Sequence, residues 1–228
     1  MNKKLLILLP VAMLTLAGCN QEGGTPGEEG GPLTKDLVIN RDVIVAAAGM
    51  DVNAKYTYPQ GDYAIQLDEY EFHATSGVGI VPSILTSSDN DGTHTNDYYW
   101  ENGIMQWRKQ GHDKGPGLIE NETPFTCKQI KVEFYYRSTP ETAEYIPYVF
   151  AKANEEDDFG VKLTAKEGTS INGTLMDGKQ DSYNSTSKTW YVNDVYKFVA
   201  TFDVSGNKYF QVAAASGVGY VGSVTFVA

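Results

Sequence analysis

Three clusters of aromatic residues in this chain could take part in ligand binding. Flat rings stack on the apolar faces of sugars, while neighbouring Asn, Asp and Arg side chains bind the hydroxyl groups. Trp100 and Trp190 are flanked by polar segments, so either burial or ligand contact fits them, whereas Arg108 lies on a predicted strand and is by default solvated. The candidate ligand-binding residues are Tyr98, Tyr99, Trp100, Arg108, Trp190 and Tyr191.

Trp107, unlike the other two tryptophans, is expected to be a core residue. It shares a strand face with Met105, and apolar alternation usually marks the buried side of a strand, so we expect Trp107 in the core. Arg108 then faces away from Trp107, on the opposite side of the sheet.

Oxygen-bearing side chains offer a weak calcium site and no assigned catalytic group. Asp89, Asp91 and Asp97 are clustered donors of the kind that calcium prefers, and the acidic run Glu155 to Asp158 is a second such cluster. The spacing fails the EF-hand register, so a solvated acidic turn is favoured, and any bound calcium would be structural. Acids are too numerous for the sequence to exclude a glycosidase pair, whose test is separation in space.

Charge and cysteine content narrow the classes of partner. The 228 residues include 18 Lys and Arg against 29 Asp and Glu, a net charge of −11. Removing residues 1–18, which contain two lysines, makes it −13. This balance argues against nucleic acid and anionic headgroups as partners. With Cys19 assigned to lipidation (below), Cys127 stands alone, and we expect a buried, inert thiol there.

Period-two alternation dominates the chain after residue 36. The clearest case is Ile130 to Arg137. One face carries Ile130, Val132, Phe134 and Tyr136, and the other carries Lys131, Glu133, Tyr135 and Arg137. Turn residues separate the strands, and no segment predicts a convincing amphipathic helix. We therefore predict an all-β antiparallel sandwich or jelly roll, as one domain over residues 37–228. The other predicted strands are Tyr63 to Leu67, Tyr70 to Ala74, Ile104 to Lys109, Tyr145 to Ala151, Tyr196 to Val204, Tyr209 to Ala215 and Val218 to Val227.

An eight-residue echo relates Ser76 to Ser83 with Ser216 to Ser223. We interpret it as a recurring strand entry. Its second copy satisfies G-x-G-x-x-G, but the dinucleotide fingerprint needs a following helix, and only six residues remain after Gly222. The sequence therefore gives no nucleotide cofactor.

The N-terminal leader has the layout of a secretory signal. Lys3 and Lys4 precede the apolar run Leu5 to Leu16, and small residues lead to Cys19. The run is shorter than the roughly 20 apolar residues of a membrane span. The leader resembles the bacterial lipoprotein signal, which implies cleavage after residue 18 and diacylglyceryl and acyl (palmitate) groups on Cys19. Residues 19–36, rich in Gly, Pro and Glu, then form a flexible linker.

Strand motifs resemble those of Bacteroidetes surface lipoproteins that have galactose-binding-like jelly-roll domains, a class that includes many carbohydrate-binding modules. The resemblance covers roughly Tyr63 to Ala228 and implies a jelly roll at the outer membrane or cell surface. The insertion from Asp89 to Trp100 departs from the pattern. The matching segments are Gly103 to Lys109, Gly117 to Thr123, Ile130 to Phe134, Phe198 to Gly206, Tyr209 to Val212 and Tyr220 to Phe226.

Three functions follow as alternatives. The first is a non-catalytic surface lipoprotein that binds a polysaccharide or other glycan through loop aromatics, without a cofactor. The second is a structural or adhesive protein that binds another protein, in which Trp100 and Trp190 would be buried or form a protein-facing patch. The third is a glycoside hydrolase, which needs two carboxylates facing each other across a cleft.

Overall fold

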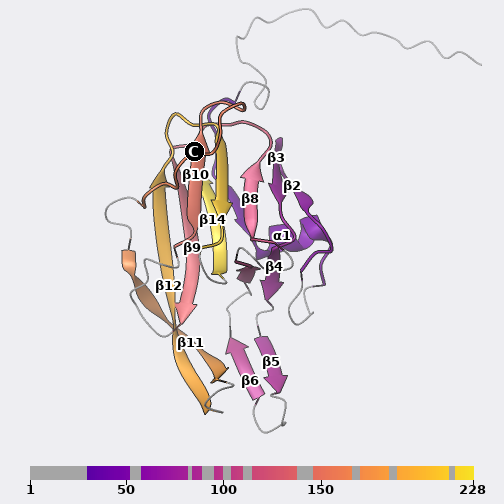
Figure 1. Ribbon diagram of the computed structural model, residues 1–228, viewed down its shortest axis with the longest axis vertical. Helices are drawn as coiled ribbons and strands as arrows, with labels where there is room; N and C mark the ends of the chain where they lie inside the picture. The colour runs from indigo at the N-terminus through magenta and orange to yellow at the C-terminus, as the bar shows by residue number, and fades with distance from the viewer. Residues whose placement is uncertain are drawn as a thin grey trace, which may run out of the picture.

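The computed structural model describes residues 30–51, 58–81, 84–88, 95–99, 104–109, 115–137, 146–165, 170–184, 189–215 and 219–228. The described chain is an all-β sandwich of two antiparallel sheets with one short helix (Figure 1). The predicted all-β sandwich is thus confirmed.

The larger sheet has seven strands in the described part of the chain, in the order β11-β12-β9-β14-β7-β4, with β1 also paired to β14. Its strands are β1 (Leu37–Asn40), β4 (Val78–Val81), β7 (Ile104–Trp107), β9 (Gln129–Arg137), β11 (Ser170–Asn184), β12 (Thr189–Asp203) and β14 (Gly219–Val227).

The smaller sheet has five described strands, in the order β10-β13-β8-β3-β2. Its strands are β2 (Tyr63–Leu67), β3 (Tyr70–Ala74), β8 (Leu118–Asn121), β10 (Tyr148–Lys152) and β13 (Tyr209–Ala213). A separate hairpin of β5 (Ile84–Ser88) and β6 (Thr95–Tyr99) lies beside β11 (Figure 1).

The core lies between the two sheets and is rich in phenylalanine. Phe72 of the smaller sheet and Phe226 of the larger one pack with ring centroids 5.3 Å apart, and Phe125 meets Phe226 edge to face at 5.4 Å. Burying such rings is the main driving force for closing the two sheets on each other. The alternation predicted for β9 is confirmed, since Ile130, Val132 and Phe134 are all buried.

No convincing amphipathic helix was predicted from the sequence, and the structure adds one short helix. Helix α1 (Arg41–Ala48) follows β1 directly. The Asn40 side chain accepts a hydrogen bond from Val43 N and caps its start, and Gly49 in the left-handed conformation ends it. Only Ile44 is buried, so the helix lacks the long amphipathic repeat on which the prediction relied.

The sequence echo has a structural counterpart. Its two copies form β4 and the start of β14, which pair with the two edges of β7. Val78 and Gly219 both face Trp107 across the ladder. The interpretation of the echo as a recurring strand entry is confirmed, and G-x-G-x-x-G lies at a strand with a bulge at Gly222.

The chain enters the described structure at one end of the sandwich. Pro32 bridges Thr126 in parallel, and Leu33 is buried, so residues 30–36 of the predicted linker lie against the sandwich. The C-terminal Ala228 donates its backbone N–H to Asp36 at 2.9 Å, which places both segments together. Strand β12 runs from Thr189 to Asp203. At about 3.3 Å per residue, these two residues lie about 45 Å apart along the strand axis.

Candidate functional site

One row of side chains crosses the outer face of the larger sheet. Ladder pairing aligns Lys197 with Tyr135, Tyr135 with Tyr220, and Tyr220 with Gln106. Directly paired residues project from the same face, so the row spans four neighbouring strands. We call this surface the outer tyrosine face. It consists of Tyr58, Gln106, Arg108, Glu133, Tyr135, Lys197 and Tyr220.

Glu133 fixes the middle of the outer tyrosine face. Its Oε1 accepts a hydrogen bond from the Tyr135 hydroxyl at 2.8 Å, and its Oε2 lies 3.3 Å from Lys197 Nζ. The carboxylate lies over Gly222, where a Cβ atom would come within 2.5 Å of Oε1 and 2.9 Å of Tyr135 Cε2. With both oxygens engaged, Glu133 is suited to orienting Tyr135.

Tyr58 and Arg108 form the other end of the outer tyrosine face. The Arg108 guanidinium carbon lies 4.4 Å from the centre of the Tyr58 ring, and the Tyr58 hydroxyl donates to Gln106 Oε1. Burial raises the pKa of the Tyr58 phenol well above its ordinary value, and Arg108 lowers this pKa by a smaller amount. The phenol therefore keeps its proton at neutral pH and donates to the buried Gln106 amide.

The backbone of Arg108 is held on both sides. Its N–H donates to Gly77 O at 2.9 Å, and its carbonyl accepts from Gly117 N at 2.7 Å. An added Cβ at Gly117 would lie 2.7 Å from Trp107 Cβ, and one at Gly77 would lie 2.6 Å from Gly115 O. These close approaches require glycine, and they fix the position from which Arg108 projects.

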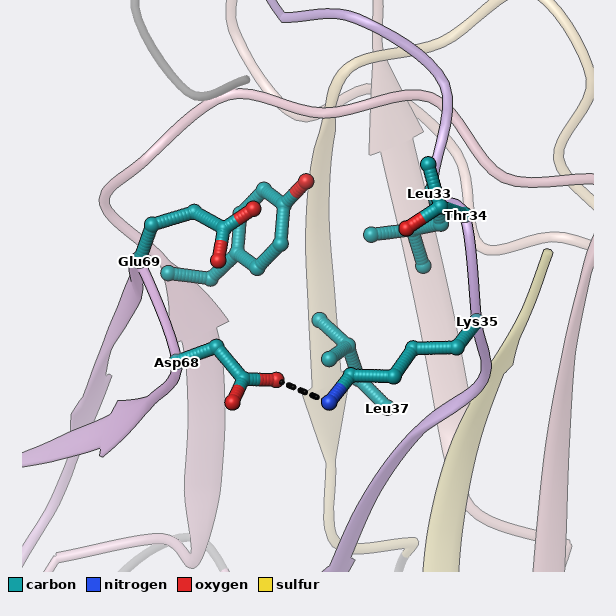
Figure 2. Close-up of a pocket in the computed structure, with 7 residues that line it drawn as sticks. Leu33, Thr34, Lys35, Leu37, Asp68 and Glu69 are labelled. Atoms are coloured by element: carbon teal, nitrogen blue, oxygen red, sulfur yellow. Dashed lines mark ion pairs between the residues drawn. The ribbon is translucent and has the colours of Figure 1, made fainter. Parts of the chain in front are cut away.

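A small pocket lies where the entering chain crosses the turn between β2 and β3 (Figure 2). Lys35 Nζ forms an ion pair with Asp68 Oδ2 at 2.9 Å above the apolar side chains of Leu33, Leu37 and Tyr70. Its volume of about 180 Å³ is below the roughly 300 Å³ of typical ligand pockets. The pocket therefore suits attachment of the entering segment better than ligand binding.

The acidic run after β10 contains an internal cation. Lys152 Nζ donates to the carbonyl oxygens of Glu155 at 2.6 Å and Asp157 at 2.8 Å. It also lies 4.9 Å from the centre of the Phe159 ring. Carbonyl oxygens of this kind are calcium ligands, and here an ammonium group occupies them. Among the residues that the structure describes, no group of three or more His, Cys, Asp or Glu could hold a metal.

The predicted core and surface positions around β7 are confirmed. Trp107 and Met105 are fully buried, and Arg108 lies on the opposite face against Tyr58. Arg108 is therefore stacked on a ring and half-buried rather than simply solvated. Cys127 is buried, as expected, and burial raises the pKa of its thiol to about 12. It is a poor nucleophile at neutral pH.

The other predicted site residues are described as backbone or lie outside the described residues. Tyr98 and Tyr99 are in β6, opposite Leu85 and Ile84, and Asp97 of the calcium candidate pairs with Thr86. In β12, Trp190 and Tyr191 pair with Tyr183 and Ser182 of β11, the strand beside which β6 lies. Cys19, Asp89, Asp91 and Trp100 lie outside the described residues.

Four residues of the outer tyrosine face were not predicted from the sequence as site residues: Tyr58, Gln106, Tyr135 and Tyr220. In the sequence, Tyr135 is an aromatic residue on the polar face of the strand that forms β9. Tyr220 is the residue that replaces Ile80 in the second copy of the echo. An aromatic side chain on the polar face of an alternating strand is the pattern that identifies such positions.

No family model matches the chain, and neither a curated protein nor a solved structure matches it. No helix in the described ranges is long and apolar enough to span a membrane.

Proposed function

We propose that this chain is a non-catalytic, lipid-anchored surface protein that binds a carbohydrate through the outer tyrosine face of its β-sandwich. The observation that carries the proposal is the row of Lys197, Tyr135, Tyr220 and Gln106 across neighbouring strands. Half-buried rings offer flat apolar surfaces, and the charged groups beside them can bind hydroxyls.

The packing of the row supports binding over catalysis. Glu133 is the acidic residue of this face, and its two carboxylate oxygens contact Tyr135 and Lys197. These contacts suit Glu133 to orienting Tyr135. A hydrolase would require a free pair of carboxylates facing each other across a cleft. Tyrosine and arginine are also common at protein interfaces. The experiment below therefore also tests a protein-binding or adhesive role.

The anchor belongs to the same proposal. Lipidation at Cys19 would tether the chain to a membrane, with the outer membrane and cell surface as the proposed location. Chains with two or more acyl groups remain stably bound. Tyr98 to Trp100 and Trp190 to Tyr191 are proposed as additional contacts, since β6 and β12 both border β11. A jelly-roll topology like that of carbohydrate-binding modules is part of this proposal.

A glycan-array and polysaccharide affinity-gel screen tests the proposed function. We would compare the full chain in detergent with its Tyr135→Ala, Tyr220→Ala, Trp100→Ala and Trp190→Ala variants, in calcium and in EDTA. Tyr148→Ala is the matched control, because Tyr148 is a half-buried tyrosine on the smaller sheet, where it packs against Lys162. We expect at least one glycan to bind, with roughly tenfold or greater weakening in Tyr135→Ala or Tyr220→Ala, which is about 1.4 kcal/mol.

A folded full chain that binds no glycan contradicts the proposal and favours the adhesive role. Binding that Tyr148→Ala removes and Tyr135→Ala and Tyr220→Ala leave intact would place the site on the other sheet.

A further inference from the structure

Arg108 carries a positive charge that no carboxylate neutralises in the part of the chain that the structure describes. Its Nε is buried and makes no hydrogen bond there, and its guanidinium contacts the Tyr58 ring. The chain has 29 acidic residues for 18 basic ones, so acids are not scarce. Burying an arginine without an anion carries a free-energy cost that a bound anion would reduce.

The described groups of the outer tyrosine face do not supply that anion. Tyr58 keeps its proton and donates to Gln106, so it contributes no negative charge. Glu133, farther along the row, already pairs with Lys197. With Arg108 and Lys197 positive and Glu133 negative, the outer tyrosine face carries a net positive charge, and this charge lies at its Arg108 end.

The guanidinium also projects from a fixed backbone. Hydrogen bonds to Gly77 and from Gly117 hold Arg108 at the end of β7, next in sequence to the buried Trp107. A guanidinium in a defined position can donate two parallel hydrogen bonds to a carboxylate or to a sulfate oxygen pair. The guanidinium carbon lies over the Tyr58 ring, and because Nε is buried, the two terminal NH2 groups are the donors that would meet a ligand.

We propose that Arg108 binds the anionic group of an acidic sugar, so that the ligand of the outer tyrosine face is a glycan that carries carboxylate or sulfate groups. This inference rests on the proposed function, because it names the class of glycan. Tyr220 and Tyr135 would contact the sugar rings, and Arg108 would select the acidic residue at one end of the row. The overall negative charge of the chain disfavours polyanions at long range, so the selection depends on this local contact.

The test is isothermal titration calorimetry on the full chain with three ligands. They are oligogalacturonate, the same oligomer with its carboxyl groups reduced to alcohols, and a sulfated galactan oligosaccharide. The variants are Arg108→Gln and Arg108→Lys, and Lys109→Gln is the control, because Lys109 is the adjacent, exposed residue. Circular dichroism confirms folding of each variant.

We expect one acidic oligomer to bind at least tenfold more tightly than the neutral one. Arg108→Gln should remove this preference, Lys109→Gln should keep it, and Arg108→Lys should restore it only in part, since an ammonium lacks the two-pronged geometry. The two acidic ligands decide between carboxylate and sulfate. If Arg108→Gln does not fold, the Arg108→Lys result decides.

Equal binding of acidic and neutral oligomers, unchanged in the Arg108 variants, would overturn the inference while the proposed function stands. Absence of binding by every glycan, here and on the array, would overturn both. In a third outcome, Tyr220→Ala no longer binds the neutral oligomer, while Arg108→Gln still prefers the acidic oligomers. That result would overturn the inference about Arg108 and leave the proposed function standing.

Discussion

Gly222 shows how a single residue shapes the outer tyrosine face. A methyl group there would come within 2.5 Å of Glu133 Oε1, the far end of a flexible side chain. We expect Gly222→Ala to cost less than about 1 kcal/mol of stability, because Glu133 can move, while the displaced carboxylate no longer orients Tyr135. Thermal unfolding and glycan titration measure the two effects. Gly160→Ala is the control, since nothing lies within 4 Å of its added Cβ; equal glycan affinity in both variants would exclude this role for Gly222.

Asn121 explains why a motif in the sequence need not indicate a binding site. Its amide donates to Thr123 O and Lys208 O at 2.8 and 2.9 Å, and its Oδ1 accepts from Phe210 N at 2.6 Å. Within the segment Gly117 to Thr123, Asn121 is thus a buried, hydrogen-bonded connection between β8 and β13.

Replacing Asn121 by Ala should destabilise the protein by about 2–4 kcal/mol, because buried backbone partners lose their bonds. Chemical denaturation measures this loss. The same change at the exposed Asn154, whose side chain bonds only within its own loop, should cost under about 1 kcal/mol. A similar cost at both positions would contradict the structural role of Asn121.

At the residue scale, sequence alternation predicted the buried Trp107 and the outward Arg108 because both depend on local geometry. It could not place Tyr58 against Arg108. That contact joins residues fifty positions apart and depends on how the segment before β2 crosses the sheet. The residues around Tyr58 show no alternation that would identify it as part of this surface.

At the scale of elements, β7 is positioned by close glycine contacts with its neighbours. Gly117→Ala would place a Cβ 2.7 Å from Trp107 Cβ and 3.0 Å from the Gly77 carbonyl oxygen, so backbone must shift. We expect a loss of about 1–3 kcal/mol in unfolding free energy and weaker glycan binding through Arg108. Gly61→Ala, with open space around the added atom, should be near neutral. If Gly117→Ala is also neutral, close packing does not position β7.

Strands that alternate over their own length were predicted, as β2 and β3 show by matching their predicted bounds. Strands β1, β5, β6 and β11 were not predicted, because they are short or polar and lack a clear apolar alternation. Helix α1 was missed because its cap, Asn40, stands before only eight helical residues, too few for a clear period of 3.6. The order of strands in each sheet was out of reach. Pairing of β14 with β1, β7 and β9 brings together segments from both ends of the chain.

At the scale of the whole molecule, the sandwich has two distinct ends. The entering segment and the C-terminus meet at one end, and the start of β12 lies at the other, beyond the outer tyrosine face (Figure 1). A lipid on Cys19 would therefore be joined to the sandwich at the first end.

Lipidation is tested by metabolic labelling with an alkyne palmitate analogue. We expect label on the wild-type protein and its recovery in the membrane fraction, because the proposed acyl chains would anchor it. Cys19→Ala should lose the label and enter the soluble fraction, while Cys127→Ala keeps both. Label that survives Cys19→Ala would refute the anchor.

Hydrogen–deuterium exchange of the full chain, with and without the glycan that binds best, tests whether a glycan binds on the outer tyrosine face of the larger sheet. We expect slower exchange in β7, in the second half of β9 and in the first half of β14, which carry Gln106, Tyr135 and Tyr220. Slower exchange confined to β8, β10 and β13 of the smaller sheet would contradict it.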